Sequence, residues 1–254
     1  MKLFSKKYGE KGQDLIIIHG LFGMSDNWNT LGKQFSKYCK VKLVDLRNHG
    51  RSPHSEDFNY DVMCEDILEY MNDHNIQKPI LLGHSLGGKV AMKFAFTHPD
   101  KIEKLIVADI SPRRYNTDFH QNLLSTLYRL PLENFEKREE IDRVLSETYD
   151  DKAMRLFILK NLFRKEKKEF AWRFNIDVLF KKLYNIQEAD FIKGVCDVPT
   201  LFIRGGHSNY ITTEDELIIN KHFSDFSITT IDGAGHWLHA ENPELFYSEV
   251  IEFC

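Results

Sequence analysis

Short apolar runs punctuate the first half of the chain and return near its end. They are brief and rich in branched residues, which favours buried strands over helices. Between them, segments such as residues 60–72 carry apolar residues on one helical face. Strands are predicted at residues 3–8, 15–18, 41–46, 79–82, 105–109, 198–203 and 227–231. Strands that alternate with helices indicate an α/β fold, with a mostly parallel sheet and helices on both faces.

The pattern changes in the middle of the chain. From residue 112 to about residue 195, charge runs and helically spaced leucines and aromatics replace the strand signals. We therefore predict a core formed by residues 1–111 and 196–254. Residues 112–195 are predicted to be a helical cap inserted in that core.

Composition limits the classes of partner. The chain has 254 residues, 42% hydrophobic and 28% charged, as expected for a soluble globular protein. A net charge of −4 gives no indication of a nucleic-acid or membrane-surface partner. The longest apolar run, residues 15–18, is too short to span a bilayer, and the N-terminal residues lack the apolar core of a signal peptide. Four scattered cysteines without a CxxC motif favour reduced thiols, so we expect a cytoplasmic protein, and no HExxH-type spacing indicates a metal site.

The strongest chemical signal is Gly83-His84-Ser85-Leu86-Gly87. It follows an apolar run and precedes a helix-forming stretch, which is the sequence form of a nucleophile elbow. The alternative is an ordinary glycine-rich loop, but a strand before the motif and a helix after it favour catalysis. Ser85 is then exposed at the turn. The helix that begins at Leu86 offers backbone N–H groups where an oxyanion would form.

Other polar residues follow predicted strands. His19, Asp109 and His236 each come directly after a strand or just beyond its turn. Because sites in parallel sheets lie at the carboxyl ends of the strands, we expect these residues near Ser85. His19 is interpreted as a structural histidine that braces its loop.

The order Gly-x-Ser-x-Gly, Asp, His resembles that of the α/β-hydrolases, whose acid and base follow the nucleophile. More closely, the chain resembles the YbfF-type bacterial esterases and their mitochondrial α/β-hydrolase-domain relatives. The stretches that carry this resemblance are residues 19–23, 45–50, 83–89, 109–112, 172–175 and 233–237. The resemblance implies a serine carboxylesterase with a small helical cap, acting on acyl esters or thioesters without a cofactor.

The resemblance also implies roles for single residues. Ser85 is the expected nucleophile and His236 the base, favoured over His239 because it lies between small residues. Backbone N–H groups of Leu21 and Leu86 are the expected oxyanion donors.

The carboxylate of the triad is harder to assign from the sequence than the nucleophile and the base. Most α/β-hydrolases carry it after the strand that is residues 201–203 here, yet residues 205–209 contain no carboxylate. Asp109 and Asp215 are the candidates. Asp109 is favoured because it ends a strand at the correct edge of the sheet.

The aromatic residues nearest the predicted site are expected to line a pocket for a small acyl ester of short to medium length. They are Phe22, Phe174, Tyr210 and Trp237. A thioesterase, an acyltransferase or a C–C bond hydrolase would use the same triad, and a ligand receptor would retain it with slow turnover. Haloalkane dehalogenases and epoxide hydrolases need an aspartate where Ser85 stands.

Overall fold

A seven-stranded sheet forms the centre of the computed structural model, which describes residues 1–116, 118–165, 169–187 and 189–254. The strand order is β1-β3-β2-β4-β5-β8-β9, and only the β1–β3 pair within this sheet is antiparallel. The strands are β1 Ser5–Tyr8, β2 Gln13–Ile18, β3 Cys39–Val44, β4 Ile80–His84, β5 Lys104–Ala108, β8 Thr200–Gly205 and β9 Phe226–Ile231. This arrangement confirms the predicted fold class.

Helices cover both faces of the sheet, and the strands alternate between the two resulting cores. In β2, Ile16 and Ile18 face one core, whereas Leu15 and Ile17 face the other. The first core is covered by α2 (Tyr60–Asp73), α3 (Leu86–Thr97) and α8 (Thr213–His222). The second is covered by α1 (Asn29–Phe35) and α10 (Pro243–Phe253), and the short α9 (Leu238–Glu241) adjoins α10.

The strand register brings the segments after four strands to one edge of the sheet. Gly83 in β4 lies opposite Ile18, the last residue of β2, and His84 lies opposite Ala108 of β5. Ala108 in turn lies opposite Ile203 of β8. The residues that follow β2, β4, β5 and β8 therefore meet at the carboxyl edge, where sites in parallel sheets form.

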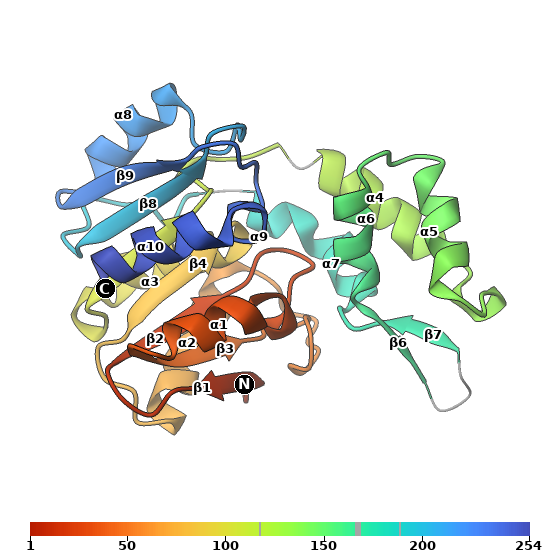
Figure 1. Ribbon diagram of the computed structural model, residues 1–254, viewed down its shortest axis with the longest axis horizontal. Helices are drawn as coiled ribbons and strands as arrows, with labels where there is room; N and C mark the ends of the chain where they lie inside the picture. Colours follow the sequence, from red (N-terminus) through yellow and green to blue (C-terminus); the bar gives the residue numbers. More distant parts are fainter. Residues whose placement is uncertain (117, 166–168, 188) are drawn as a thin grey trace.

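A separate unit is inserted between β5 and β8 and lies beside the sheet (Figure 1). It contains α4 (Asp118–Arg129), α5 (Arg138–Ser146), α6 (Lys152–Leu159) and α7 (Ile176–Lys182). It also contains the antiparallel hairpin of β6 (Leu162–Arg164) and β7 (Phe170–Trp172). The expectation of an insertion without strands was therefore wrong at this hairpin, because strands this short carry no alternation that separates them from the charged flanks.

Hydrogen bonds fix the insertion to loops of the sheet. Asn161 Nδ2 donates to the carbonyl of Phe22 at 2.8 Å, and the backbone N–H of Asn175 donates to the carbonyl of Asn48 at 2.9 Å. Tyr60 Oη on α2 donates to the carbonyl of Ile186 at 2.7 Å. The insertion is thus held over the loops that follow β2 and β3.

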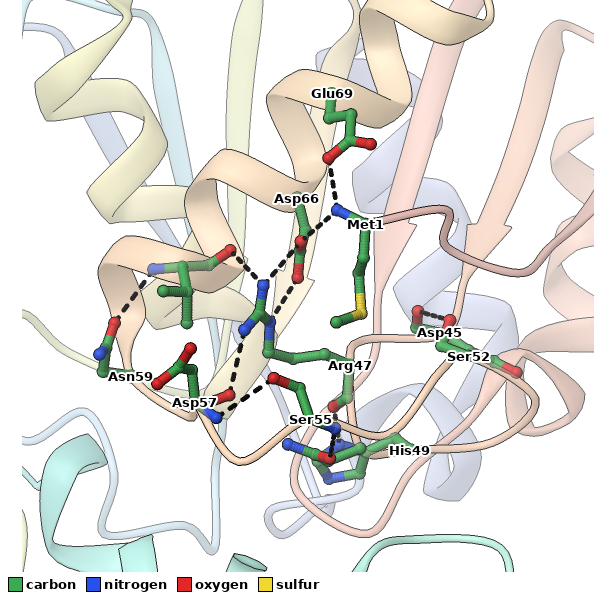
Figure 2. Close-up of polar contacts among 12 residues, drawn as sticks. Met1, Asp45, Arg47, His49, Ser52, Ser55, Asp57, Asn59, Asp66 and Glu69 are labelled. Carbon is green, nitrogen blue, oxygen red and sulfur yellow. Dashed lines mark hydrogen bonds and ion pairs between the residues drawn. The ribbon is translucent and has the colours of Figure 1, made fainter.

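The loop after β3 is itself anchored by charge. Arg47 reaches Asp66 on α2 through Nε at 2.6 Å and Nη2 at 2.8 Å, as Figure 2 shows. The amino group of Met1 lies 2.9 Å from the same carboxylate. Such bidentate, charge-assisted contacts give a loop a defined position. Across the described residues, no helix is long and apolar enough to cross a membrane.

Candidate active site

Ser85 occupies a strained turn between β4 and α3. Its φ of 52° and ψ of −114° lie outside the regions that a serine normally adopts. A Cβ on Gly83 would lie 2.2 Å from the carbonyl oxygen of Gly87, and a Cβ on Gly87 would lie 2.2 Å from that of Ile18. Only glycine fits at both positions. The turn leaves Ser85 partly exposed, while both of its neighbours in sequence are buried.

Asp109 and His236 are in direct contact. Oδ2 of Asp109 lies 2.7 Å from Nδ1 of His236, and it also accepts a hydrogen bond of 2.5 Å from Ser208 Oγ. Oδ1 accepts from the backbone N–H of Gly205 at 3.0 Å. The carboxylate is completely buried, so these donors stabilise its charge. A proton on Nδ1 that faces the carboxylate leaves Nε2 of His236 as the basic nitrogen.

Contacts with His84 and Tyr210 hold His236 and its loop in place. His84 Nε2 donates to the carbonyl oxygen of His236 at 2.8 Å. Burial holds the pKa of His84 well below its usual range, so its ring is neutral. The Tyr210 ring stacks on the His236 ring with centroids 3.9 Å apart and planes at 19°. These contacts leave His236 little freedom to rotate.

Asp215, the other candidate acid, serves a different purpose. Its carboxylate accepts from Arg113 Nε at 2.7 Å, from Ser111 Oγ at 2.8 Å and from the backbone N–H of Thr212 at 2.8 Å. The last contact belongs to the capping box at the start of α8. The structure therefore brings Asp109, rather than Asp215, to His236.

His239 lines the same cavity as Ser85 and His236, but its ring lies against Trp28 and His84. Its ring stacks on Trp28 with centroids 4.1 Å apart. Burial lowers its pKa to about 3. It packs in the wall behind His84, at a ring distance of 4.6 Å.

The loop after β2 passes beside Ser85 and is braced by His19. His19 Nδ1 donates to the carbonyl of Gly20 at 2.8 Å, and Nε2 accepts from the backbone N–H of Leu46 at 3.0 Å. Both ring nitrogens are used, and burial lowers the pKa to about 4, as a structural role requires. Leu21 follows within this loop. Leu86, the first residue of α3, adjoins Ser85 on the other side.

Two cavities open next to Ser85. The first, here called the Trp237 cavity, has about 540 Å³ of empty space, part of it open to solvent. The second, the Tyr115 cavity, has about 450 Å³ of empty space, again partly open to solvent. Both include Leu21, Ser85 and His120 in their walls. Residues specific to the Trp237 cavity include Phe22, Met154, Phe157, Ile158, His236 and Trp237. Residues specific to the Tyr115 cavity include Tyr60, Leu86, Ile110, Tyr115, Ile186 and Tyr210.

The four predicted pocket aromatics separate into two groups. Phe22 and Trp237 line the Trp237 cavity, and Tyr210 lines the Tyr115 cavity. Phe174 differs from its prediction, because it is buried behind Phe22 at a ring distance of 5.3 Å and stacks on Trp172. Its outer side borders a separate surface groove. Phe174 thus supports the wall that Phe22 presents to the cavity.

Two residues of the site were not predicted. Ser208 lies in the loop after β8, where the expected carboxylate is missing, and its hydroxyl binds Asp109 instead. His120 is not among the residues predicted for the pocket, yet it lines both cavities. The signal was its position on α4, because it shares the helical face of the buried residues Leu123, Leu124 and Leu127. Among the residues with a described position, no group of three or more His, Cys, Asp or Glu side chains has the arrangement of a metal site.

Several known proteins are similar to this chain in sequence and fold. Residues 15–243 match the family described as alpha/beta hydrolase fold. The solved structure named "Marine microorganism esterase" is 42% identical, with a TM-score of 0.96 over 100% of this chain and 99% of its own. A putative esterase/lipase of Haemophilus influenzae is 38% identical over 94% of this chain and 82% of its own length. Esterase YbfF of Escherichia coli is 31% identical over 91% of this chain and 88% of its own length.

These similarities confirm the predicted fold and the resemblance to esterases. The family match extends from β2 to the start of α10, so it includes the elbow and the strand ends described above. The chain belongs to the α/β-hydrolase family, among the serine hydrolases of the esterase and lipase type.

Proposed function

We propose that this protein is a serine carboxylesterase that hydrolyses short- to medium-chain acyl esters through an acyl-enzyme at Ser85. The observation that carries the proposal is the 2.7 Å contact between Asp109 and His236, in a site where His236 and Ser85 line the same cavity. A nucleophile, a base and a residue that orients the base are the parts that such a reaction needs.

In the proposed reaction, the Ser85 hydroxyl attacks the ester carbonyl while His236 Nε2 takes its proton. Backbone N–H groups of Leu21 and Leu86 bind the oxyanion, each contributing about 3 kcal/mol. His236 then protonates the leaving alcohol, and the acyl group remains on Ser85. A water molecule, deprotonated by His236, releases the acid. Asp109 stabilises the imidazolium that forms in both steps.

Residues 112–195 are proposed to act as a cap, and residues 1–111 with 196–254 as the catalytic core. Two cap helices contribute to the walls of the Trp237 cavity. From α4 come Phe119, His120 and Leu123, and from α6 come Met154, Phe157 and Ile158. Apart from His120 these side chains are apolar, which favours an uncharged substrate over a charged one.

Substrate panels test this proposal. We expect hydrolysis of p-nitrophenyl esters, with the highest kcat/KM at short to medium chain length and loss of activity in Ser85→Ala. Circular dichroism controls for folding of the variant. Unchanged hydrolysis in Ser85→Ala would overturn the proposal.

The same panel separates the competing functions. Acyl-CoA substrates of matched chain length would be the better substrates of a thioesterase or acyltransferase. A turnover below about one per minute on every ester, far under the usual range of enzymes, would favour a ligand receptor. Either result would contradict the carboxylesterase assignment.

A further inference from the structure

His120 lies at the junction of the two cavities. It comes from α4 of the inserted segment, and it lines both cavities together with Ser85 and Leu21. An ester that extends across Ser85 from one cavity into the other therefore lies beside His120.

The hydrogen-bonding capacity of His120 is unused. Within the described part of the chain, no hydrogen bond joins its ring to another residue. Its neighbours include the rings of Phe22 and Phe119, with centroids 6.4 Å and 5.6 Å away. His120 is half-buried and lines both cavities, so a substrate bound there can supply a hydrogen-bond partner for its ring.

Three other polar side chains of the Trp237 cavity are already engaged, whereas the buried Nδ1 of His239, which also lines it and stacks on Trp28, has no hydrogen-bond partner. His19 uses both ring nitrogens within its own loop, and His84 binds the carbonyl of His236. Asn27 Oδ1 accepts from the backbone N–H of Met24 at 2.8 Å. His120 contrasts with these residues because its nitrogens remain available to the cavity.

The charge state of His120 restricts the partner. Burial, together with the nearby His236, lowers its pKa to about 4. At neutral pH the ring therefore presents one N–H donor and one acceptor nitrogen. A neutral hydroxyl complements such a ring better than a carboxylate does, because no cation is present to balance the carboxylate charge.

The position of His236 determines which part of the ester meets His120. The leaving oxygen must lie near His236, which lines the Trp237 cavity, whereas Tyr210 of the Tyr115 cavity covers one face of the imidazole. The alcohol part is therefore directed into the Trp237 cavity and the acyl part into the Tyr115 cavity.

We propose that His120 is a substrate-binding residue that hydrogen-bonds a hydroxyl group on the alcohol part of the ester, close to the scissile bond. The preferred substrates are then esters of diols or polyols rather than of simple alkanols. This inference rests on the proposed esterase function and specifies its substrate class.

A matched pair of esters tests the inference. 2-Hydroxyethyl butanoate and propyl butanoate have the same shape and differ by a hydroxyl in place of a methyl group. One neutral hydrogen bond predicts about a five- to tenfold higher kcat/KM for the hydroxyethyl ester in the wild type. In His120→Phe the ratio should fall to one or below, and His120→Gln, which retains polar atoms, should keep part of it.

Asn122→Ala is the control variant, because Asn122 lies on the exposed side of the same helix and should leave the ratio unchanged. A wild-type ratio near one, or an unchanged ratio in His120→Phe, would overturn the inference while the esterase function stood. A His120-dependent preference for propyl 3-hydroxybutanoate over propyl 3-methylbutanoate, without one for the hydroxyethyl ester, would also overturn it. Hydrolysis of no ester at all would instead overturn the proposed function itself.

Discussion

Asp109 combines two tasks that are often separate in a protein. Its carboxylate holds the loop after β8 through Gly205 and Ser208, and it also holds His236. Its φ of 49° is unusual for an aspartate, and its N–H donates to the carbonyl of Ile203 at 2.8 Å. Strain of this kind persists where the surrounding contacts define the conformation.

Replacement of Asp109 tests the proposed division of roles. In Asp109→Asn, the amide no longer fixes the Nδ1–H tautomer of His236, so we expect turnover of p-nitrophenyl esters to fall by about 10⁴-fold. The matched variant Asp215→Asn weakens the capping box at the N-terminus of α8 and the ion pair with Arg113. It should lower the Tm while turnover changes little. Loss of turnover in Asp215→Asn, with activity kept in Asp109→Asn, would contradict the assignment.

Among single residues, the sequence predicted the members of the candidate site that directly follow a strand or its turn. Ser85, Asp109 and His236 follow strands, so their approach to one another could be inferred from topology alone. Ser208 could not be inferred, because a serine in a glycine-rich loop has many structural uses. His120 also could not, because its role depends on how the insertion is placed over the sheet.

The elbow is the element on which the geometry of the site depends. The start of α3 lies directly against β2, where the Cα of Gly87 approaches the carbonyl of Ile18 too closely for a side chain. This contact positions Leu86 and Ser85 relative to the loop after β2. The proposed oxyanion donors come from these two segments, so their spacing depends on the contact.

Gly87→Ala tests this dependence. The added methyl group would collide with the backbone carbonyl of Ile18. Backbone atoms cannot change rotamer to relieve the collision, as a side chain can. We expect a loss of about 1–3 kcal/mol in the free energy of unfolding, measured with urea, and a reduced kcat. Gly206→Ala is the control, because its nearest new contacts would be at an ordinary 3.4 Å. Equal stability of the two variants would show that the elbow tolerates displacement.

Elements were predicted well where the pattern was long or strictly periodic. Apolar runs indicated the parallel strands, and α2 was evident from its apolar face. The hairpin of β6 and β7 was missed because each strand pairs only three residues.

Across the whole molecule, several histidines are buried in neutral form around the carboxyl edge of the sheet. Burial lowers the pKa of His49 and of His239 to about 3, and that of His19 to about 4. The ring centroids of His19 and His49 are 5.2 Å apart, so their protonation would also bring like charges together.

This burial predicts a loss of stability in mild acid. Above the ordinary pKa of 6.5, both the folded and the unfolded chain hold neutral imidazoles. Below it, the unfolded chain binds protons that the folded chain accepts only near pH 4 or lower. The free energy of unfolding should therefore fall as the pH falls from about 6.5 to 4, with up to about 1.4 kcal/mol per pH unit from each such histidine.

Urea unfolding at a series of pH values measures this slope. His239→Phe keeps an aromatic ring against Trp28 and removes one titrating group, so its slope should be smaller than that of the wild type. Identical slopes, or greater stability in acid, would contradict the burial of a neutral His239.

The most direct test of the account is covalent trapping of Ser85. The folded protein is treated with a fluorophosphonate, and the adduct is located by intact-mass and peptide mass spectrometry. The account predicts one adduct, on Ser85, with none in Ser85→Ala and slower labelling in Asp109→Asn. Absence of an adduct on the folded wild type, or labelling that persists in Ser85→Ala, would contradict it.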